Sequence, residues 1–387
     1  METRRRVAIS VMIAWVLMGS CGDAQSLYWV ESTFSSPSLK KSAVDGSNVQ
    51  TLNLDSASLP QGIAYDARRD SVYWVELAFA GARINAASPS PAARRTVLGG
   101  ASVLRDIAVD TAARTMYWTA TNLATGSMIL RANLNGTSPD TLIKWNPGGA
   151  EAPRGIALDV AAGKMYWADF DLGRIRGANL NGTTLEDILS SLNGPVGLRL
   201  DVAGGKMYWT EANARTIKRA NLNGSGIEML VTTTGTPNYI ALDIVGGKMY
   251  WTEIGIPKIR KADLNGQNAQ DIPVSVNDPA GIMVVRTALN DVSFNPSVIP
   301  HEYALLQNYP NPFNPSTTIQ YDLPFAGNVS LRVYDYLGRE ITVLAEGHAD
   351  AGSYKATWNA GRVASGVYFY KLRSESYTQV RRMLLVK

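Results

Sequence analysis

The side chains in this sequence that could carry out chemistry are mostly carboxylates, amides and arginines. The only histidines are His301 and His348, and the only cysteine is Cys21. None of the three lies between residues 25 and 286. A Ser–His or Cys–His nucleophile and an imidazole-ligated zinc or iron site are therefore excluded from that part of the chain.

Two recurring sets of polar residues are candidates for a binding site. The first set is the acid found two residues after a repeated Tyr-Trp pair: Glu31, Glu76, Asp169, Glu211 and Glu253. The second set begins a repeated apolar segment: Gln61, Arg105, Arg154 and Asn238. Aromatic residues near them in sequence are Phe34, Phe79, Trp145 and Phe170. Together these suit a polar or peptide ligand; the alternative is that the acids pair with neighbouring Arg and Lys and fix the structure.

Carboxylates also bind calcium, so an oxygen-ligated calcium site is compatible with the composition. The other recurring acids end the apolar segments: Asp66, Asp110, Asp159, Asp201 and Asp243. Each falls where a strand would enter a turn, and Asp side chains cap turn backbones. We therefore predict no metal and no other cofactor.

The elements that must position these residues come from an internal repeat. Six Tyr-Trp pairs occur at spacings of 42 to 49 residues. They are Tyr28-Trp29, Tyr73-Trp74, Tyr117-Trp118, Tyr166-Trp167, Tyr208-Trp209 and Tyr250-Trp251. This period fits the four short strands and turns of a propeller blade.

One period reads as four strands, at 196–200, 206–210, 216–221 and 226–230. The last two are joined by Asn223-Gly224, and Asn-Gly recurs at Asn135, Asn181 and Asn265. Asn-Gly predicts a type I′ hairpin turn with positive φ at both central residues. Asp45-Gly46 takes its place in the first repeat, and the second repeat, around 82–90, has lost it.

The first strand of each period has its own signature, an apolar segment that ends in Asp in five copies. A sixth copy, 281–285, follows the last Tyr-Trp pair, whereas the first pair at Tyr28 has no such segment before it. Both irregularities disappear if the last strand completes the blade that the N-terminus begins, which leaves no open blade edge. The sequence therefore predicts an all-β fold, a closed ring of six blades over residues 25–286.

The repeated residues resemble the YWTD, or low-density lipoprotein receptor class B, propeller family. The tetrads read YWVE, YWVE, YWTA, YWAD, YWTE and YWTE, so only Asp169 keeps the family's usual fourth residue. This is a divergent branch, and receptor-type ligands are not carried over. Adjacent strand residues point to opposite faces, so we expect one ring of each pair to pack toward each neighbouring blade.

Residues 303–387 read as seven short strands, a small immunoglobulin-like β-sandwich, after a linker at 287–302. Its motifs are LQNYPNPFNP at 306–315, VYDYLGRE at 333–340, AGSY at 351–354, SGVYFY at 365–370 and the basic-apolar end RMLLVK. In this order they resemble the type A sorting domain of type IX secretion. The resemblance implies that residues 303–387 contact the secretion machinery and direct the chain across the outer membrane.

The N-terminus supports export. Residues 1–24 read as a signal peptide with Arg4 to Arg6, a twelve-residue apolar run and a cleavage site after Ala24. Lipidation at Cys21 is the alternative. The apolar run is too short to span a bilayer, so no transmembrane helix is expected in the mature chain. The net charge is +4, without a basic cluster, and nucleic-acid binding is not expected.

These observations predict a bacterial protein that is secreted or held at the outer surface. With no catalytic set in view, we expect a binding protein for a peptide, protein or glycan and not an enzyme. The alternatives are a calcium-dependent hydrolase or lyase of the lactonase type and a structural component of the envelope.

Overall fold

The computed structural model describes residues 25–54, 58–67, 69–78, 81–87, 94–100, 102–122, 124–286, 293–295, 300–349, 351–361, 363–374 and 377–387. The leader and Cys21 lie outside these ranges. Within them the chain forms strands joined by turns, and no helix suited to crossing a membrane is found there.

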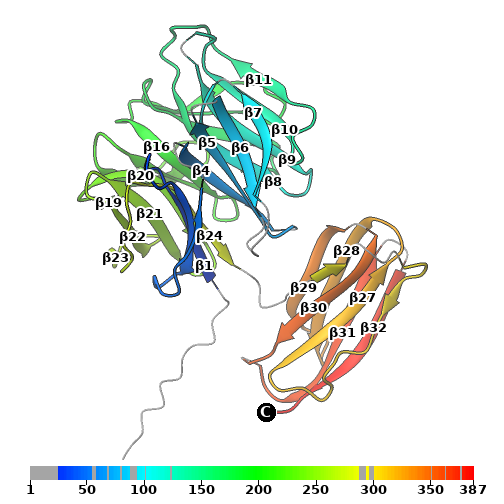
Figure 1. Cartoon of the computed structure of the whole chain (residues 1–387). Helices are drawn as coiled ribbons and strands as arrows, with labels where there is room; N and C mark the ends of the chain where they lie inside the picture. Colours follow the sequence, from blue (N-terminus) through cyan, green and yellow to red (C-terminus); the bar gives the residue numbers. More distant parts are fainter. Residues whose placement is uncertain are drawn as a thin grey trace, which may run out of the picture.

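Six antiparallel sheets of four strands, here called blades, come first in the chain (Figure 1). Blade 1 contains β24 (Pro279–Arg286), β1 (Gln25–Glu31), β2 (Ser38–Ala43) and β3 (Gln50–Asn53). Blade 2 contains β4 (Ser58–Asp66), β5 (Ser71–Ala78), β6 (Gly81–Ala87) and β7 (Arg95–Gly100). Blade 3 contains β8 (Val103–Asp110), β9 (Thr115–Thr121), β10 (Met128–Asn133) and β11 (Asp140–Lys144).

The other three blades repeat this order. Blade 4 contains β12 (Pro153–Asp159), β13 (Lys164–Asp169), β14 (Arg174–Asn179) and β15 (Glu186–Leu189). Blade 5 contains β16 (Pro195–Asp201), β17 (Lys206–Glu211), β18 (Thr216–Asn221) and β19 (Glu228–Thr232). Blade 6 contains β20 (Thr236–Asp243), β21 (Lys248–Ile254), β22 (Lys258–Asp263) and β23 (Gln270–Asp271).

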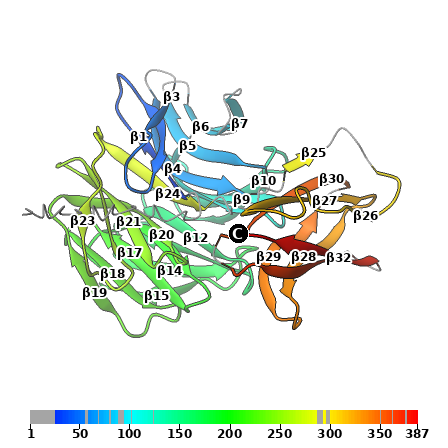
Figure 2. The ribbon, with the colours of Figure 1, turned by 90° about the horizontal axis from the view of Figure 1, so that it is seen from below.

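The six blades form a closed ring. The first strands contact one another in the order β4, β8, β12, β16, β20, β24 and back to β4, so they surround a common axis. The ring closes where β24 pairs with β1, with Gln25 opposite Arg286 and Trp29 opposite Ile282 (Figure 2). The predicted six-bladed propeller and its closure by the last strand are confirmed.

The Tyr-Trp pairs supply the contacts between blades. All six indoles are at most 3% exposed and all six tyrosines at most 5%. At each interface the Tyr of one blade packs in the same cluster as the Trp of the next, as Tyr208 does with Trp251 and Tyr166 with Trp209. Burial of aromatic surface at every interface gives the ring a continuous core.

The Asn-Gly turns differ from the type I′ prediction. In the blade 3 turn, Gly136 has φ +86°, but Asn135 does not adopt positive φ. The Gly136 amide donates to Asn133 O (2.8 Å), and the Asn135 side chain accepts a hydrogen bond from the Thr137 amide. These bonds describe a type I turn followed by a left-handed glycine. Gly136 also lies close to Val97 O of blade 2, where a Cβ would be 2.1 Å away, so glycine is required.

The C-terminal part forms two four-stranded sheets packed as a sandwich. One contains β25 (Ser293–Asn295), β30 (Gly352–Asn359), β27 (Ser316–Leu323) and β26 (Ala304–Leu305). The other contains β29 (Glu340–Ala349), β28 (Gly327–Asp335), β31 (Gly366–Ser374) and β32 (Tyr377–Leu385). Their shared core includes Trp358, which packs against Phe313 and Tyr368. Residues 293–295, expected in the linker, pair with β30 instead.

Candidate ligand-binding site

The six inner strands share a β-bulge close to their beginnings. In β8 the pairing with β9 shifts between Leu104 and Ile107, which leaves Arg105 and Asp106 out of register, and equivalent shifts occur in the other five blades. The end of the ring at which these strands begin is called the mouth here. A bulge changes the direction in which the side chains of a strand point. The residues in these bulges therefore determine the chemistry at the mouth.

The first bulge position carries most of the second candidate set. Given in the order of blades 2, 3, 4, 5, 6 and 1, the residues at the first bulge position are Gln61, Arg105, Arg154, Val196, Asn238 and Ala280. The second position holds Gly62, Asp106, Gly155, Gly197, Tyr239 and Gly281. Glycine is needed where neighbouring strands nearly touch: a Cβ on Gly281 would lie 2.2 Å from Gln61 O. Asp106 and Tyr239 are the two exceptions.

Tyr239 and Asp106 cross-link the inner strands. The Tyr239 hydroxyl donates to Arg105 O (2.6 Å), and β20 and β8 belong to blades 6 and 3, which are opposite in the ring. Asp106 is fully buried and accepts hydrogen bonds from Arg199 Nη1 (3.0 Å) and the Ile156 amide (3.1 Å). Burial raises the pKa of Asp106, and burial also raises the pKa of Tyr239 far above its ordinary value. The Tyr239–Arg105 bond therefore crosses the axis next to the mouth.

Arg105 and Arg154 lie side by side at the mouth, on adjacent inner strands. Burial lowers the pKa of Arg105, and the positive charge of Arg154 lowers it further. The Nε atoms of both arginines are buried and have no hydrogen-bond partner among the described residues. The Arg154 guanidinium stacks on the Phe170 ring, with Cζ 4.8 Å from the ring centre. Among the described residues neither arginine forms an ion pair with an acid, and Asp171 acts on Arg105 without pairing with it.

The other candidates from this set make weaker or main-chain contacts. Gln61 is half-buried and donates to Ser32 Oγ (3.1 Å). Asn238 is half-buried, and its carbonyl accepts a hydrogen bond from Thr210. Phe34 lies in the β1–β2 turn at the mouth and is 63% exposed. Trp145 packs on Trp167 and under Arg176, and Phe79 lies outside the described residues.

The acids that follow the Tyr-Trp pairs are buried inside the blades. Glu31, Glu76, Asp169, Glu211 and Glu253 are at most 3% exposed. In four blades the Glu accepts a hydrogen bond from the indole of the Trp two residues earlier, as in Trp251 Nε1–Glu253 (2.8 Å). Each acid also lies within 4.0 Å of a Lys or Arg, for example Lys218 beside Glu211. These contacts match the alternative given above, in which the acids pair with neighbouring Arg and Lys and fix the structure.

Asp169 is the one acid that leaves its indole unpaired. Trp167 Nε1 has no partner among the described residues, and Arg176 Nη1 is 4.0 Å from Asp169 Oδ2. Asp169 Oδ1 accepts a hydrogen bond from the Ala152 amide (3.0 Å). Its side chain is one methylene shorter than the Glu of blades 1, 2, 5 and 6, which explains the missing bond. Burial raises the pKa of Asp169.

The third residue of the tetrad proves to be a link between blades. Thr252 Oγ1 accepts from the Tyr239 amide of its own blade and donates to Ala280 O of the next. Thr119 and Thr210 make the equivalent pairs of bonds. Sequence reasoning did not single out these threonines, although their polar type at an otherwise apolar position is a usable signal.

The strand-ending aspartates act as turn caps. Asp110, Asp159, Asp201 and Asp243 each accept backbone N–H bonds from the following turn. Within the described ranges no group of three or more His, Cys, Asp and Glu side chains is arranged to hold a metal ion.

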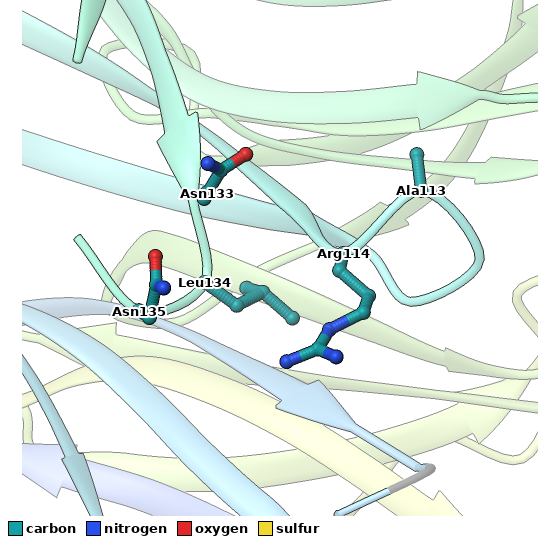
Figure 3. A pocket seen from close by; sticks show the side chains of 5 residues that line it. All are labelled: Ala113, Arg114, Asn133, Leu134 and Asn135. Atoms are coloured by element: carbon teal, nitrogen blue, oxygen red, sulfur yellow. The ribbon is translucent and has the colours of Figure 1, made fainter. Parts of the chain in front are cut away.

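A shallow hollow of about 340 Å³ lies at the other end of blade 3, in the turns that join β8 to β9 and β10 to β11. Arg114 extends there toward the hairpin that carries Asn133 and Asn135 (Figure 3). Arg114 has φ +57°, whereas blades 4 to 6 place Gly163, Gly205 and Gly247 at this position.

Comparison with known proteins agrees with both parts of the chain. Residues 205–244 match the low-density lipoprotein receptor repeat class B, and residues 307–387 match the secretion system C-terminal sorting domain. No curated protein sequence matches the chain significantly.

Solved structures give the same fold. A chain in the crystal structure of a nidogen/laminin complex is 21% identical, with a TM-score of 0.57 over 67% of this chain and 98% of that one. TolB from Acinetobacter baumannii is 12% identical, with a TM-score of 0.57 over 68% of this chain and 67% of its own. A putative TolB from Agrobacterium tumefaciens is 10% identical, with a TM-score of 0.50 over 65% and 89%.

Proposed function

We propose that this chain, a propeller protein with a class B repeat and a secretion sorting domain, binds a ligand outside the cell through the mouth of its ring. The sorting domain indicates export to the outer surface or secretion. The finer proposals are that residues 1–24 are a cleaved leader, that the propeller covers residues 25–286, and that residues 303–387 engage the type IX machinery.

One observation carries the proposal of ligand binding. The mouth presents guanidinium groups whose buried Nε atoms have no partner among the described residues, above the hydrogen bond by which Tyr239 crosses the axis. Buried polar groups are almost always paired, so an unpaired cluster at an accessible end of a ring calls for a ligand. No histidine or cysteine accompanies them between residues 25 and 286, which favours binding over catalysis.

The proposed site comprises Arg105 and Arg154 at its centre, Gln61 and Asn238 beside them, and Phe34 and Phe170 at its rim. The tetrad acids are left out because their carboxylates are committed to indole, Lys and Arg partners inside the blades. A protein of the same fold takes part in the nidogen/laminin complex, which is a precedent for recognition by this fold and not for a particular partner.

The experiment is a binding screen with the purified chain from Gln25 to Lys387 on printed peptides and oligosaccharides. We expect hits whose binding is lost in a double variant at the mouth, Arg105→Gln with Arg154→Gln. The matched control is Arg131→Gln, which removes an exposed arginine paired with Asp140 on the outside of blade 3. Equal loss in the control, or hits unaffected by the mouth variant, would place binding elsewhere.

A further inference from the structure

We infer that the ligand is an acidic peptide and that one of its carboxylates binds between the guanidinium groups of Arg105 and Arg154. This inference rests on the proposed binding at the mouth and names the chemistry of the ligand there.

The two mouth arginines have no acid partner among the described residues, whereas several other arginines of the propeller do. Six arginines elsewhere in the described propeller have a carboxylate within hydrogen-bond distance: Arg131 with Asp140 (3.0 Å), Arg174 with Asp187 (2.6 Å), Arg176 with Asp187 (2.9 Å), Arg199 with Asp106 (3.0 Å), Arg219 with Glu228 (2.6 Å) and Arg260 with Asp271 (2.9 Å). No such ion pair is found for Arg105 or Arg154 within the described ranges. Arg114 and Arg215 likewise have no such ion pair in the described chain, so the mouth pair is distinguished by two such arginines lying together with buried, unpaired Nε atoms.

The electrostatic state of the pair calls for an anion. Arg105 is partly buried, and its pKa is lowered first by that burial and then by the neighbouring charge of Arg154. Asp171, an exposed residue of the β13–β14 turn, raises the pKa of Arg105 by its negative charge, but it forms no ion pair with Arg105 in the described chain. Two cations and one acid that forms no ion pair with them leave an excess of positive charge, which a bound carboxylate would neutralise.

The geometry of the donors suits a carboxylate. A guanidinium is a planar fork that binds both oxygens of a carboxylate at once. Arg154 is held in place by stacking on Phe170, and the main chain of Arg105 is fixed by the Tyr239 hydroxyl. A donor held in advance, as the Arg154 guanidinium is, loses little conformational entropy when the ligand binds.

The aromatic groups near the pair favour a peptide over an acidic sugar. An oligosaccharide subsite needs the free face of an aromatic ring on which the sugar can stack. Arg154 covers the Phe170 ring, and Trp145 packs against Trp167 and Arg176. The exposed Phe34 ring belongs to blade 1, which adjoins neither of the blades that carry Arg105 and Arg154. The Tyr239–Arg105 bond crosses the axis below the pair, so the carboxylate is expected to approach from the mouth.

The test uses the chain from Gln25 to Lys387 and an array of acidic peptides. Each peptide is printed beside a neutral partner in which Asp and Glu are replaced by Asn and Gln and the C-terminus is amidated. Uronic acid and sulfated oligosaccharides are printed on the same array. Fluorescence anisotropy then gives Kd for each hit with the parent chain, Arg105→Gln, Arg154→Gln, Arg154→Lys and the control Arg131→Gln, after circular dichroism has shown each variant to be folded.

We expect the acidic peptides to bind and their neutral partners to bind at least about tenfold more weakly, a difference of about 1.4 kcal/mol. Arg105→Gln and Arg154→Gln should each weaken binding at least tenfold. Arg154→Lys should weaken it less than Arg154→Gln, because Lys keeps the charge but loses the fork. Arg131→Gln should leave Kd unchanged, and added salt should weaken binding.

The contrary outcomes separate the two proposals. Hits that are neutral peptides or oligosaccharides, and that are lost in the mouth variants, overturn the acidic-peptide inference and leave mouth binding intact. Acidic peptides that bind equally well to Arg105→Gln also overturn the inference. No hit of any kind, with folded protein, overturns both.

Discussion

The Tyr239 hydroxyl donates a 2.6 Å hydrogen bond to the main-chain oxygen of Arg105, which is 134 positions earlier in the chain and in the opposite blade. The bond therefore spans the axis of the ring. It joins blades that share no interface, and it fixes the backbone of a residue proposed to hold the ligand.

Removing this hydroxyl should loosen the ring. Tyr239→Phe leaves Arg105 O without its donor, and we expect a loss of about 1–2 kcal/mol in the free energy of unfolding of the propeller. Urea unfolding followed by tryptophan fluorescence measures it. The control Tyr336→Phe removes a hydroxyl from a residue that is 73% exposed and should have no effect. Equal stability of Tyr239→Phe and the parent would show that the bond contributes little.

Asp169→Glu should stabilise the protein. The longer side chain can reach Trp167 Nε1, as Glu253 reaches Trp251, while its second oxygen serves the backbone as Glu253 serves the Gly235 amide. We expect a gain of about 1 kcal/mol, the value of a typical buried hydrogen bond. Thermal unfolding compares it with Asp187→Glu, an exposed acid in an outer strand. A lower Tm for Asp169→Glu would mean that blade 4 has no room for the extra methylene.

Thr252→Val tests the link between blades 6 and 1. Valine has the shape of threonine and already stands at this position as Val30 and Val75 in blades 1 and 2. The change removes a donor from Ala280 O and an acceptor from the Tyr239 amide, so we expect a loss of about 1–3 kcal/mol. Thr115→Val, near the surface, is the control. The prediction is refuted by a Thr252→Val variant that unfolds at the parent's urea concentration.

The pH dependence of stability should carry a contribution from Asp106. Burial raises its pKa in the folded protein, so the folded state binds more protons than the unfolded state between the two pKa values. Stability should therefore fall as pH rises from the ordinary carboxyl range through the folded-state pKa, and Asp106→Asn should remove that fall. The contribution of Asp263 has the opposite sign, because its hydrogen bond with Lys248 lowers its pKa in the folded protein. Its carboxylate therefore makes stability rise with pH, and Asp263→Asn should remove that rise.

Arg105→Gln should stabilise the protein in the absence of ligand. The substitution removes a partly buried charge beside Arg154, and we expect a gain of about 0.5–1 kcal/mol, as for other relieved charge repulsions. Thermal unfolding of the purified chain measures it against Arg131→Gln, which breaks an ion pair and should not stabilise. A destabilised Arg105→Gln would show that the guanidinium has a structural role.

Much of the propeller could be predicted from the sequence because its signals are local and repeated. The spacing of the Tyr-Trp pairs sets the blade period, and the unmatched segment at 281–285 reveals the closure with β1. The sequence predicts the fourth strand of blade 5 at 226–230. In the structure this strand, β19, starts two residues later at Glu228, because residues 226 and 227 belong to the preceding turn. The Asn-Gly turn was misjudged because the Asn side chain caps the turn and only glycine needs positive φ.

The candidate site was less accessible from sequence because it depends on contacts across the ring. The bulge that exposes Arg105 and Arg154 is a register shift between strands, which no periodicity reports. The Tyr239–Arg105 bond joins residues that only the closed ring brings together. The pairing of Glu253 with Trp251, by contrast, follows from strand geometry, because residues two apart share a face.

The pairing of β24 with β1 also sets an order of events in the making of the protein. Blade 1 lacks its innermost strand until residues 279–286 have been synthesised, so β1 keeps an unpaired edge while the rest of the propeller is already available to fold. A chain that stops anywhere before Pro279 cannot complete the ring, however many intact repeats it contains. A finished propeller therefore differs from a truncated one by a single exposed strand edge, that of β1.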